Sequence, residues 1–367
     1  MAININTYRE FMNWRYDAHK AFLIECLLPK IKANKTITIG THNESFHCDE
    51  VMATAMLEAL VVELGGSCEI HRIDRKNTAL LNSMDILVDV GREFDPARGR
   101  FDHHQVGGAG RRISRFGEND IPLSSCGLVW YAFGLLLTGE QDLAVRANRG
   151  DTIPQTLAFD KVDRELIRGI DASDNGVGMP SGYRIGEEDG SVTEVAGSPM
   201  HLSRIIGQFN SGNPHDHELQ YQQFSAALGI ARAVFANALR DAKAFAEARP
   251  QLEKALSAKR ENAEVLILDR YLRWSDHLGQ VDDGGQIKLV IAPLGGEHDE
   301  WNLHVVRRRG RLALQGAPAD WCGKEGKALE KASGIGGMVF CHGGGHMVRV
   351  SGKETALKVA EKLLNAA

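Results

Sequence analysis

The stretch Thr36-Ile37-Thr38-Ile39-Gly40-Thr41-His42-Asn43-Glu44-Ser45-Phe46-His47-Cys48-Asp49-Glu50 decides the fold of the chain. Its first four residues alternate two β-branched types and are followed by a glycine, which predicts a strand that runs into a loop. From Asp49 to Leu64 the apolar side chains lie on one helical face, which predicts a helix. A strand, a polar loop and a helix in immediate succession indicate the start of an α/β domain.

Two further strands extend this pattern. Residues 69–72 follow the helix after Gly65-Gly66, and residues 85–91 form a nearly continuous apolar run that ends around Asp89. Such a run is typical of a parallel strand buried on both faces. We therefore predict an α/β fold, a doubly wound and mainly parallel sheet, whose ligands bind beyond the carboxyl ends of the strands.

The remaining pattern divides the chain into an N-terminal helical extension (1–33), a main domain with connecting helices (34–262) and a smaller C-terminal α+β domain (263–367). Residues 8–32, 124–138, 159–170 and 217–258 are predicted helices, and 180–199 is predicted to be an exposed loop. In the last domain we expect strands at 264–268, 287–292, 303–306 and 337–341, and helices at 324–332 and 354–364.

Composition narrows the class of protein. The 367 residues are 43% hydrophobic and 25% charged, with a net charge of -5 and a pI of about 6.3, so the chain as a whole has no attraction for nucleic acid or an anionic membrane. The six scattered cysteines are typical of a reducing compartment. We expect no signal peptide and no membrane span, and hence a cytoplasmic protein.

Potential metal ligands follow the predicted strands in four clusters. They are His42 with His47, Asp49 and Glu50; Asp89; Asp102-His103-His104; and Asp171 with Asp174. Each cluster alone also fits a helix cap, a turn or a solvated loop. Four clusters at one sheet edge instead favour a metal site, and mixed imidazole and carboxylate ligands suit Mn²⁺, Zn²⁺ or Co²⁺ better than Mg²⁺ or Ca²⁺.

Longer motifs resemble the MYG (melanocyte proliferating gene) exonuclease family of the DHH phosphoesterase superfamily. They cover nearly the whole chain beyond the N-terminal extension and comprise Ile39 to Asn43, Phe46 to Glu50, Val88 to Gly91, Phe94 to Pro96, Phe101 to Gln105, Leu123 to Val129, Asp171 to Gly176 and Ser333 to His342. The resemblance implies a DHH-type catalytic domain, a C-terminal substrate-binding domain, and 3′ to 5′ exonuclease activity on RNA.

The resemblance also implies roles for single residues. Six of them would be the ligands of what we expect to be two divalent ions, most simply Mn²⁺, with Zn²⁺, Co²⁺ or Mg²⁺ as alternatives: His42, His47, Asp49, Asp89, His103 and Asp174. Asp89 would bridge the ions, Asp102 would orient a neighbouring ring, and His104 would contact the phosphate. The chain departs from the DHH pattern at His47, where an aspartate is usual and the spacing from His42 is one residue longer.

Substrate contacts are expected from residues outside this set. Arg111 and Arg112 carry positive charge, and Gly343-Gly344-Gly345-His346 resembles a glycine-rich substrate motif, although it also fits a flexible turn. Arg307-Arg308-Arg309-Gly310-Arg311 offers a basic face or is a solvated hairpin.

We predict a metal-dependent phosphodiester hydrolase that acts on single-stranded RNA or short oligonucleotides through a metal-activated hydroxide. The alternatives are a phosphatase for a small nucleotide and a non-catalytic protein that binds metal or nucleic acid. The sequence leaves the oligomeric state open.

Overall fold

The computed structural model describes residues 19–112, 121–140, 156–177, 183–185, 192–194, 201–210, 212–213, 215–259, 263–282, 284–295, 299–308 and 311–366. The chain forms two compact units, Met1–Lys243 and Ala244–Ala367, which divide within the long helix α10 (His217–Ser257). The predicted boundary near residue 262 lies just after this helix. The predicted N-terminal extension is described only from residue 19, where helical turns continue through η1 (Leu23–Leu27) and α2 (Leu28–Lys32).

The first unit contains a five-stranded sheet in the order β2-β1-β3-β5-β4. The strands are β1 (Ile37–His42), β2 (Cys68–Ile73), β3 (Ile86–Val88), β4 (Phe94–Asp95) and β5 (Arg100–Phe101). All neighbours are parallel except β4, which is antiparallel to β5. The α/β class with a mainly parallel sheet is therefore confirmed, and the short strands β4 and β5 are additions to the predicted set.

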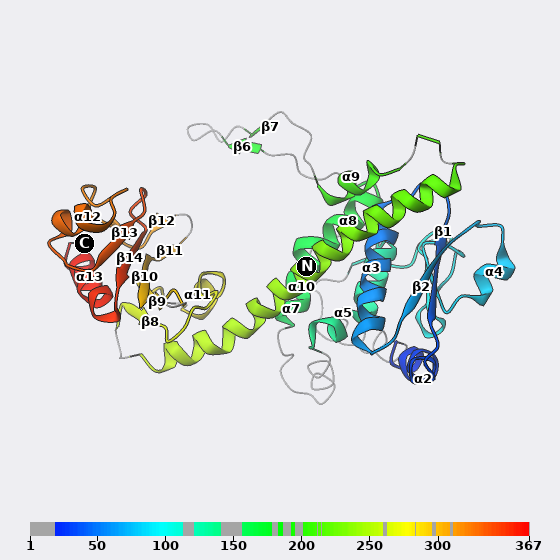
Figure 1. The fold of residues 1–367 in the computed structure, drawn as a ribbon, viewed down its shortest axis with the longest axis horizontal. Coiled ribbons are helices and arrows are strands. Elements are labelled where there is room, and N and C mark those ends of the chain that lie inside the picture. Colours follow the sequence, from blue (N-terminus) through cyan, green and yellow to red (C-terminus); the bar gives the residue numbers. More distant parts are fainter. Residues whose placement is uncertain are drawn as a thin grey trace. The chain divides into compact units, whose positions relative to one another are not determined.

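Helices cover this sheet (Figure 1). Helix α3 (Cys48–Glu63) packs on β1 and β3, and α5 (Ser125–Thr138) packs on α3 and β5. Most of their apolar side chains are buried, as are Ile37 and Ile39 of β1, whereas Val62 near the end of α3 is exposed. Gly40 separates those strand residues from His42, and a Cβ atom there would lie 2.9 Å from the side chains of both Leu87 and Met84. Only glycine lets β1 approach β3 this closely.

The other helices of this unit are short. They are α4 (Thr78–Ser83), α7 (Leu157–Val162), the π-helical turn η3 (Asp163–Ile167), α8 (Arg168–Asp174) and α9 (Leu202–Gly207). The predicted helix 159–170 thus continues to Asp174 through a π-turn. The stretch 180–199, predicted to be a loop throughout, contains the hairpin β6 (Tyr183–Ile185) and β7 (Val192–Glu194); its other residues lie outside the described part.

The second unit has its own sheet, in the order β13-β14-β10-β9-β8. Its strands are β8 (Val265–Ile267), β9 (Leu289–Pro293), β10 (Glu300–Val305), β13 (Met338–Cys341) and β14 (Met347–Ser351). Helices α11 (Ser275–Val281), α12 (Gly326–Ser333) and α13 (Lys353–Asn365) accompany it, and β11 (Arg307–Arg308) pairs with β12 (Arg311–Leu312) as a hairpin. Trp321 and Leu329 lie in the core of this unit.

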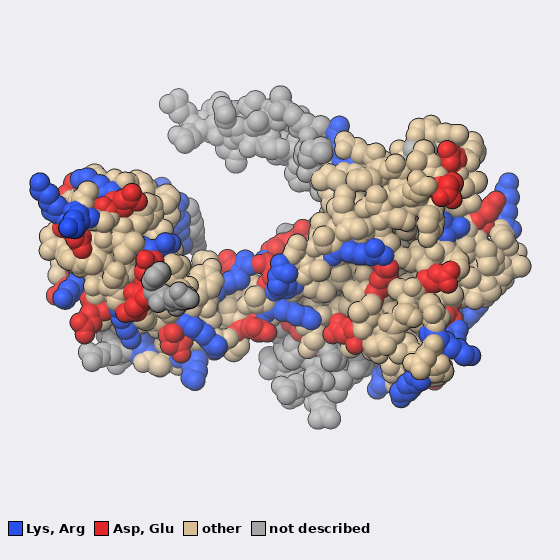
Figure 2. All heavy atoms as spheres, viewed as in Figure 1, with Lys and Arg blue, Asp and Glu red and all other residues tan. Residues whose placement is uncertain are grey.

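Acidic and basic side chains are interspersed on the face shown in Figure 2, in keeping with a nearly balanced composition. Among the described residues, no helix is both long and apolar enough to cross a membrane.

Candidate metal centre

The candidate centre lies at the carboxyl ends of β1, β3 and β5. These strands are neighbours and run in parallel, so the residues that end or follow them meet: His42, Asp89 and the run Asp102-His103-His104. The first turn of α3 adds Asp49 and Glu50, and the last residue of α8 adds Asp174. His42, Asp49, Glu50 and Asp174 lie within a strand or helix, and the other residues follow a strand within three positions, so the side chains are placed without long loops.

Asp89 is the residue shared by most contacts of the centre. Its backbone has a φ of 55°, a left-handed conformation that turns the chain sharply at the end of β3. One carboxylate oxygen lies 3.3 Å from His42 Nε2. The other lies 3.4 Å from His103 Nε2 and 3.2 Å from His104 Nδ1, and it accepts a hydrogen bond from Ser125 Oγ at 3.1 Å. Asp89 thus faces three imidazoles through both of its oxygens.

Asp102 holds the ring of His104. Its Oδ1 lies 2.9 Å from His104 Nδ1 and accepts the backbone N–H of His104 at 3.0 Å, while Oδ2 accepts the N–H of Arg92 at 2.6 Å. The carboxylate is fully buried, but 42% of the His104 side chain is exposed. One face of this oriented imidazole is therefore open to a ligand.

His103 lies between carboxylates. Its Nε2 is 3.3 Å from Asp174 Oδ2 and 3.9 Å from Asp49 Oδ2, in addition to its contact with Asp89. His42 similarly lies 3.1 Å from Glu50 Oε1. The Glu50 carboxylate also accepts the N–H of His47 at 2.8 Å, which ties the loop before α3 to the helix.

A cavity of about 300 Å³ opens beside Asp49 and Asp174. Its polar wall also includes His47, His201 and Arg204, the last two from the start and middle of α9. His201 Nδ1 is buried and has no hydrogen-bond partner among the described residues. The cavity therefore places imidazole and guanidinium groups opposite two carboxylates.

Several buried polar atoms of the centre have no hydrogen-bond partner among the described residues. They are both carboxylate oxygens of Asp49 and Nδ1 of His42. Leaving such groups unpaired costs free energy, so a partner is expected. Ligand atoms converge to within 4.8 Å in three groups: Asp89-His103-His104, His42-Glu50-Asp89 and His47-Asp49-Asp174. The residues therefore fit divalent cations.

The crowding of charges shifts the pKa values of these side chains. Burial raises the pKa of Asp49 well above its ordinary value, and the charges of Asp89 and Asp174 raise it further. Burial opposes a charged His42, but hydrogen bonds to Asp89 and Glu50 outweigh it and raise that pKa to about 9. For Asp89, the three imidazoles outweigh burial and lower the pKa. Excess negative charge thus collects around Asp49, where a cation would be most stabilised.

The six predicted metal ligands and the pair Asp102 and His104 all lie together in this centre. Arg112 does not join them as predicted: it is 5% exposed, and its guanidinium pairs with Asp163 and lies 3.5 Å from Asp171 Oδ2. Its charge is committed to a buried ion pair, so we correct its assignment as a substrate contact. Arg111 is exposed, whereas Gly343, Gly344, Gly345 and His346 lie in the second compact unit.

Three contributors are missing from the predicted ligand set. Glu50 was recognised as part of the ligand-rich loop but assigned no role, and its buried carboxylate is now seen beside His42. Ser125 lies within a motif of the family resemblance, yet a serine at a helix start reads simply as a cap. His201 follows the stretch 180–199, whose sequence shows no helical or strand periodicity. Only the tertiary fold brings His201 to the cavity.

Asp171, the other acid of the fourth cluster, has a structural position. It is fully buried, and its Oδ1 accepts hydrogen bonds from Ser124 N and Oγ and from Gly127 N at the start of α5. Burial raises its pKa to about 6, although Arg112 and Ser124 oppose the shift. Asp171 thus satisfies the first N–H groups of α5 rather than facing the metal-ligand groups.

Comparison with known proteins identifies relatives along the whole chain. Residues 38–364 match the family model MYG1_exonuc, described as an uncharacterised protein family, UPF0160. The chain is 30% identical to the MYG1 protein of Dictyostelium discoideum, over 90% of this chain and 97% of the relative. It is 29% identical to the MYG1 exonuclease of Homo sapiens, over 89% of this chain and 85% of that protein.

A solved structure, RecJ of Thermus thermophilus in complex with Mn²⁺, matches with a TM-score of 0.26 and 12% sequence identity. The match covers 95% of this chain but 54% of the RecJ chain, so this protein spans about half the length of that structure.

Proposed function

The chain belongs to the MYG1_exonuc family, and from this premise we propose that it is a metal-dependent phosphodiester hydrolase that shortens single-stranded RNA or short oligonucleotides from the 3′ end. The family supports a nuclease, since the human relative is named an exonuclease. The observation that carries the proposal is the set of three converging ligand groups, with the unpaired carboxylate of Asp49 buried among them.

The arrangement of the ligand groups favours two divalent ions. Asp89 belongs to two of the three groups and presents a different oxygen to His42 than to His103, as a bridging carboxylate would. His47, Asp49 and Asp174 form the remaining group, in which the imidazole of His47 stands where an aspartate is usual in the DHH pattern. The mixture of nitrogen and oxygen ligands suits Mn²⁺, Zn²⁺ or Co²⁺, of which we propose Mn²⁺.

The protein residues would supply binding, orientation and charge. His104, held by Asp102 and half exposed, is placed to donate a hydrogen bond to a phosphate oxygen. Asp89, Asp49 and Asp174 would hold the cations in fixed positions. When bound, such ions lower the pKa of a coordinated water and neutralise charge that develops on the phosphoryl group. The scattered cysteines, all free, support a cytoplasmic location.

Asp89→Asn tests the centre directly. The substitution replaces one carboxylate oxygen with an NH₂ group and so removes a charged ligand. We expect the rate of hydrolysis to fall by about 100-fold or more, which exceeds the loss typical of residues that only support a ligand. Asp74→Asn is the matched control, because Asp74 is exposed and its carboxylate accepts only the N–H of Lys76 in the same loop. Thermal melts of both variants should match the unchanged protein.

The readout is the ladder of products from RNA labelled at its 5′ end, with Mn²⁺, with chelator, and after Mn²⁺ is restored. A 3′ to 5′ exonuclease yields a ladder of progressively shorter labelled products. Full activity after the metal has been stripped and confirmed absent by elemental analysis would refute the proposal. Parallel assays with DNA and with a nucleoside bisphosphate measure the substrate preference.

A further inference from the structure

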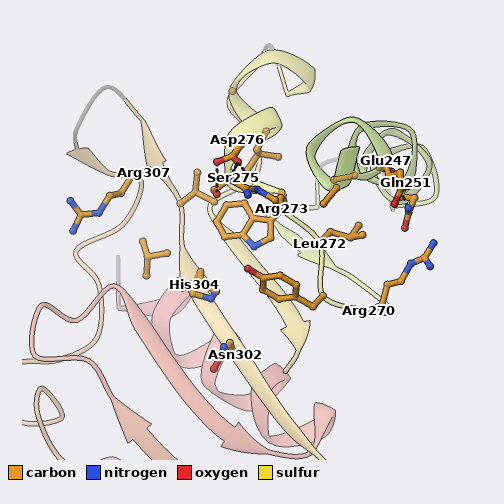
Figure 3. A pocket seen from close by; sticks show the side chains of 18 of the residues that line it. Glu247, Gln251, Arg270, Leu272, Arg273, Ser275, Asp276, Asn302, His304 and Arg307 are labelled. Carbon is orange, nitrogen blue, oxygen red and sulfur yellow. Dashed lines mark hydrogen bonds and ion pairs between the residues drawn. The ribbon is translucent and has the colours of Figure 1, made fainter. Parts of the chain in front are cut away.

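A large hollow lies in the second compact unit, and no residue of the candidate metal centre lines it (Figure 3). Its volume is about 1050 Å³, and its walls come from the end of α10, the segment Arg270–Asp276 and one side of β10. That volume is large enough to admit a nucleotide.

Aromatic and imidazole rings line this hollow. Tyr271 is 65% exposed, which is unusual for so large an apolar ring beside a cavity and leaves its ring free to stack. Trp274 and His304 lie with their ring centroids 5.6 Å apart. Because burial and the nearby His346 lower the pKa of His304 to about 4, its imidazole is neutral at neutral pH. His304 and the amide of Asn302 therefore offer uncharged hydrogen-bonding groups.

The positive charges of the hollow are not all neutralised. Arg273 pairs with Asp276, with 2.9 Å between Nη2 and Oδ2. Arg270 and Arg307 are exposed, and within the described residues neither forms an ion pair with a carboxylate. Figure 3 shows them on opposite sides of the hollow with His304 between them. Arg307 also begins the hairpin β11–β12, which carries the arginine-rich run of the sequence.

We propose that this hollow binds single-stranded nucleic acid, with one base stacked on Tyr271, its polar edge facing His304 and Asn302, and the flanking phosphates held by Arg270 and Arg307. Exposed aromatic rings combined with unpaired cations match a flat base joined to an anionic backbone. The inference rests on the proposed function, for which it supplies a substrate-binding surface in the second unit.

Tyr271→Ala tests the stacking. The full-length protein is titrated into a fluorescein-labelled oligonucleotide whose phosphorothioate linkages resist hydrolysis, and binding is followed by anisotropy. Loss of one base stack predicts a dissociation constant that is roughly 5- to 100-fold weaker. Tyr271→Phe keeps the ring and should bind nearly as well as the unchanged protein. Tyr221→Ala, at an exposed tyrosine of α10 in the first unit, is the matched control and should bind normally.

Arg270→Gln tests the phosphate contact independently. Removing one cation that neutralises a phosphate should reduce the slope of log affinity against log salt concentration by about 0.7 for a single strand. Because Arg270 and Tyr271 are exposed, neither substitution should lower the melting temperature.

Three outcomes test the hollow, the single strand as its ligand and the proposed function. Normal binding by Tyr271→Ala together with an unchanged salt slope for Arg270→Gln overturns the inference. Equal competition by a mononucleotide overturns the assignment of a strand, because a strand fills more of the hollow. The metal-dependent product ladder on labelled RNA reports on the proposed function separately: its absence would refute that function, whereas its persistence with unaltered oligonucleotide binding by both variants would refute the hollow alone.

Discussion

At the scale of single residues, Asp102-His103-His104 shows how three adjacent side chains divide their contacts. Side chains that follow one another after a strand project in different directions. Asp102 turns inward to the N–H of Arg92 and the ring of His104, whereas His103 reaches Asp89 and Asp174. The tripeptide thus has one residue that orients, one that faces carboxylates and one that remains open to solvent.

Asp102→Asn is expected to reduce the rate of hydrolysis by about 10- to 100-fold, the usual loss when a residue that orients a functional histidine is replaced. The amide is nearly the same size but cannot offer both oxygens to His104 and Arg92. Metal content, measured by elemental analysis, should stay unchanged because Asp102 belongs to none of the ligand groups. Asp95→Asn is the control: its carboxylate accepts the N–H of Ala97 away from the centre. Equal rates for both variants would contradict the orienting role.

The sequence was most informative about residues at strand ends, since the order of parallel strands brings those ends together. It identified His42 after a β-branched strand and Asp89 near the end of an apolar run, whereas His103 was identified from the tripeptide Asp102-His103-His104. The prediction that Arg112 contacts the substrate was wrong, because no local pattern reveals that Asp163, far along the chain, forms an ion pair with it. The left-handed backbone of Asp89 was not predicted either, because aspartate adopts that conformation only occasionally and no turn residue beside it marks the position.

At the scale of elements, the position of α5 depends on a carboxylate from another helix. Asp171 of α8 accepts N–H groups at the start of α5, and that helix carries Ser125, which donates to Asp89. The anionic carboxylate also lies at the positive end of the helix dipole. The contact leaves no room for a side chain at Gly127, where a Cβ atom would lie 2.6 Å from Asp171 Oδ1.

Gly127→Ala should therefore destabilise the protein by about 1–3 kcal/mol, because the added methyl group displaces Asp171 from the helix start. Gly229→Ala provides the opposite control. Gly229 lies inside α10, is exposed and has no neighbouring atom within 4 Å of a Cβ, so alanine should stabilise the helix by roughly 0.5–1 kcal/mol. Urea denaturation measures both changes. A Gly127→Ala variant as stable as the unchanged protein would contradict this account of the helix start.

Elements with a strong repeating pattern were predictable, and short ones were not. The helices α3, α5 and α10 have long apolar faces, and their predicted bounds differ from the observed ones by at most one residue at each end. The two-residue strands β4 and β5 are too short to show alternation, so only their pairing with neighbours defines them. The same limit applies to α9, whose His201 was consequently missed.

At the scale of the whole molecule, the two units have separate hydrophobic cores and contain different tryptophans. Of the tryptophans in the described residues, Trp130 lies in the first unit, whereas Trp274, Trp301 and Trp321 lie in the second. Three of the five tryptophans in the sequence thus belong to the second unit, so tryptophan fluorescence follows the unfolding of that unit together with signals from Trp14 and Trp130. Because the two-state treatment applies to single domains, the two transitions should be analysed individually.

The stability of the second unit should fall as the pH falls from about 6.5 to about 4. In that range His304 takes up a proton in the unfolded chain, where its pKa is ordinary, but not in the folded unit, where burial lowers the pKa to about 4. Unfolding is then coupled to proton uptake, so the free energy of unfolding rises with pH across this window. The contribution of this residue is at most about 3 kcal/mol, reached near pH 4.

His304→Gln isolates that contribution. The variant should lose less stability than the unchanged protein between pH 6.5 and pH 4, as measured by urea denaturation followed by tryptophan fluorescence. Some dependence should remain, because burial also lowers the pKa of His277 in the same unit. His215→Gln, at an exposed histidine of the first unit, should leave the profile of the second unit unchanged. Parallel profiles for His304→Gln and the unchanged protein would contradict this prediction, because they would mean that folding does not lower the pKa of His304.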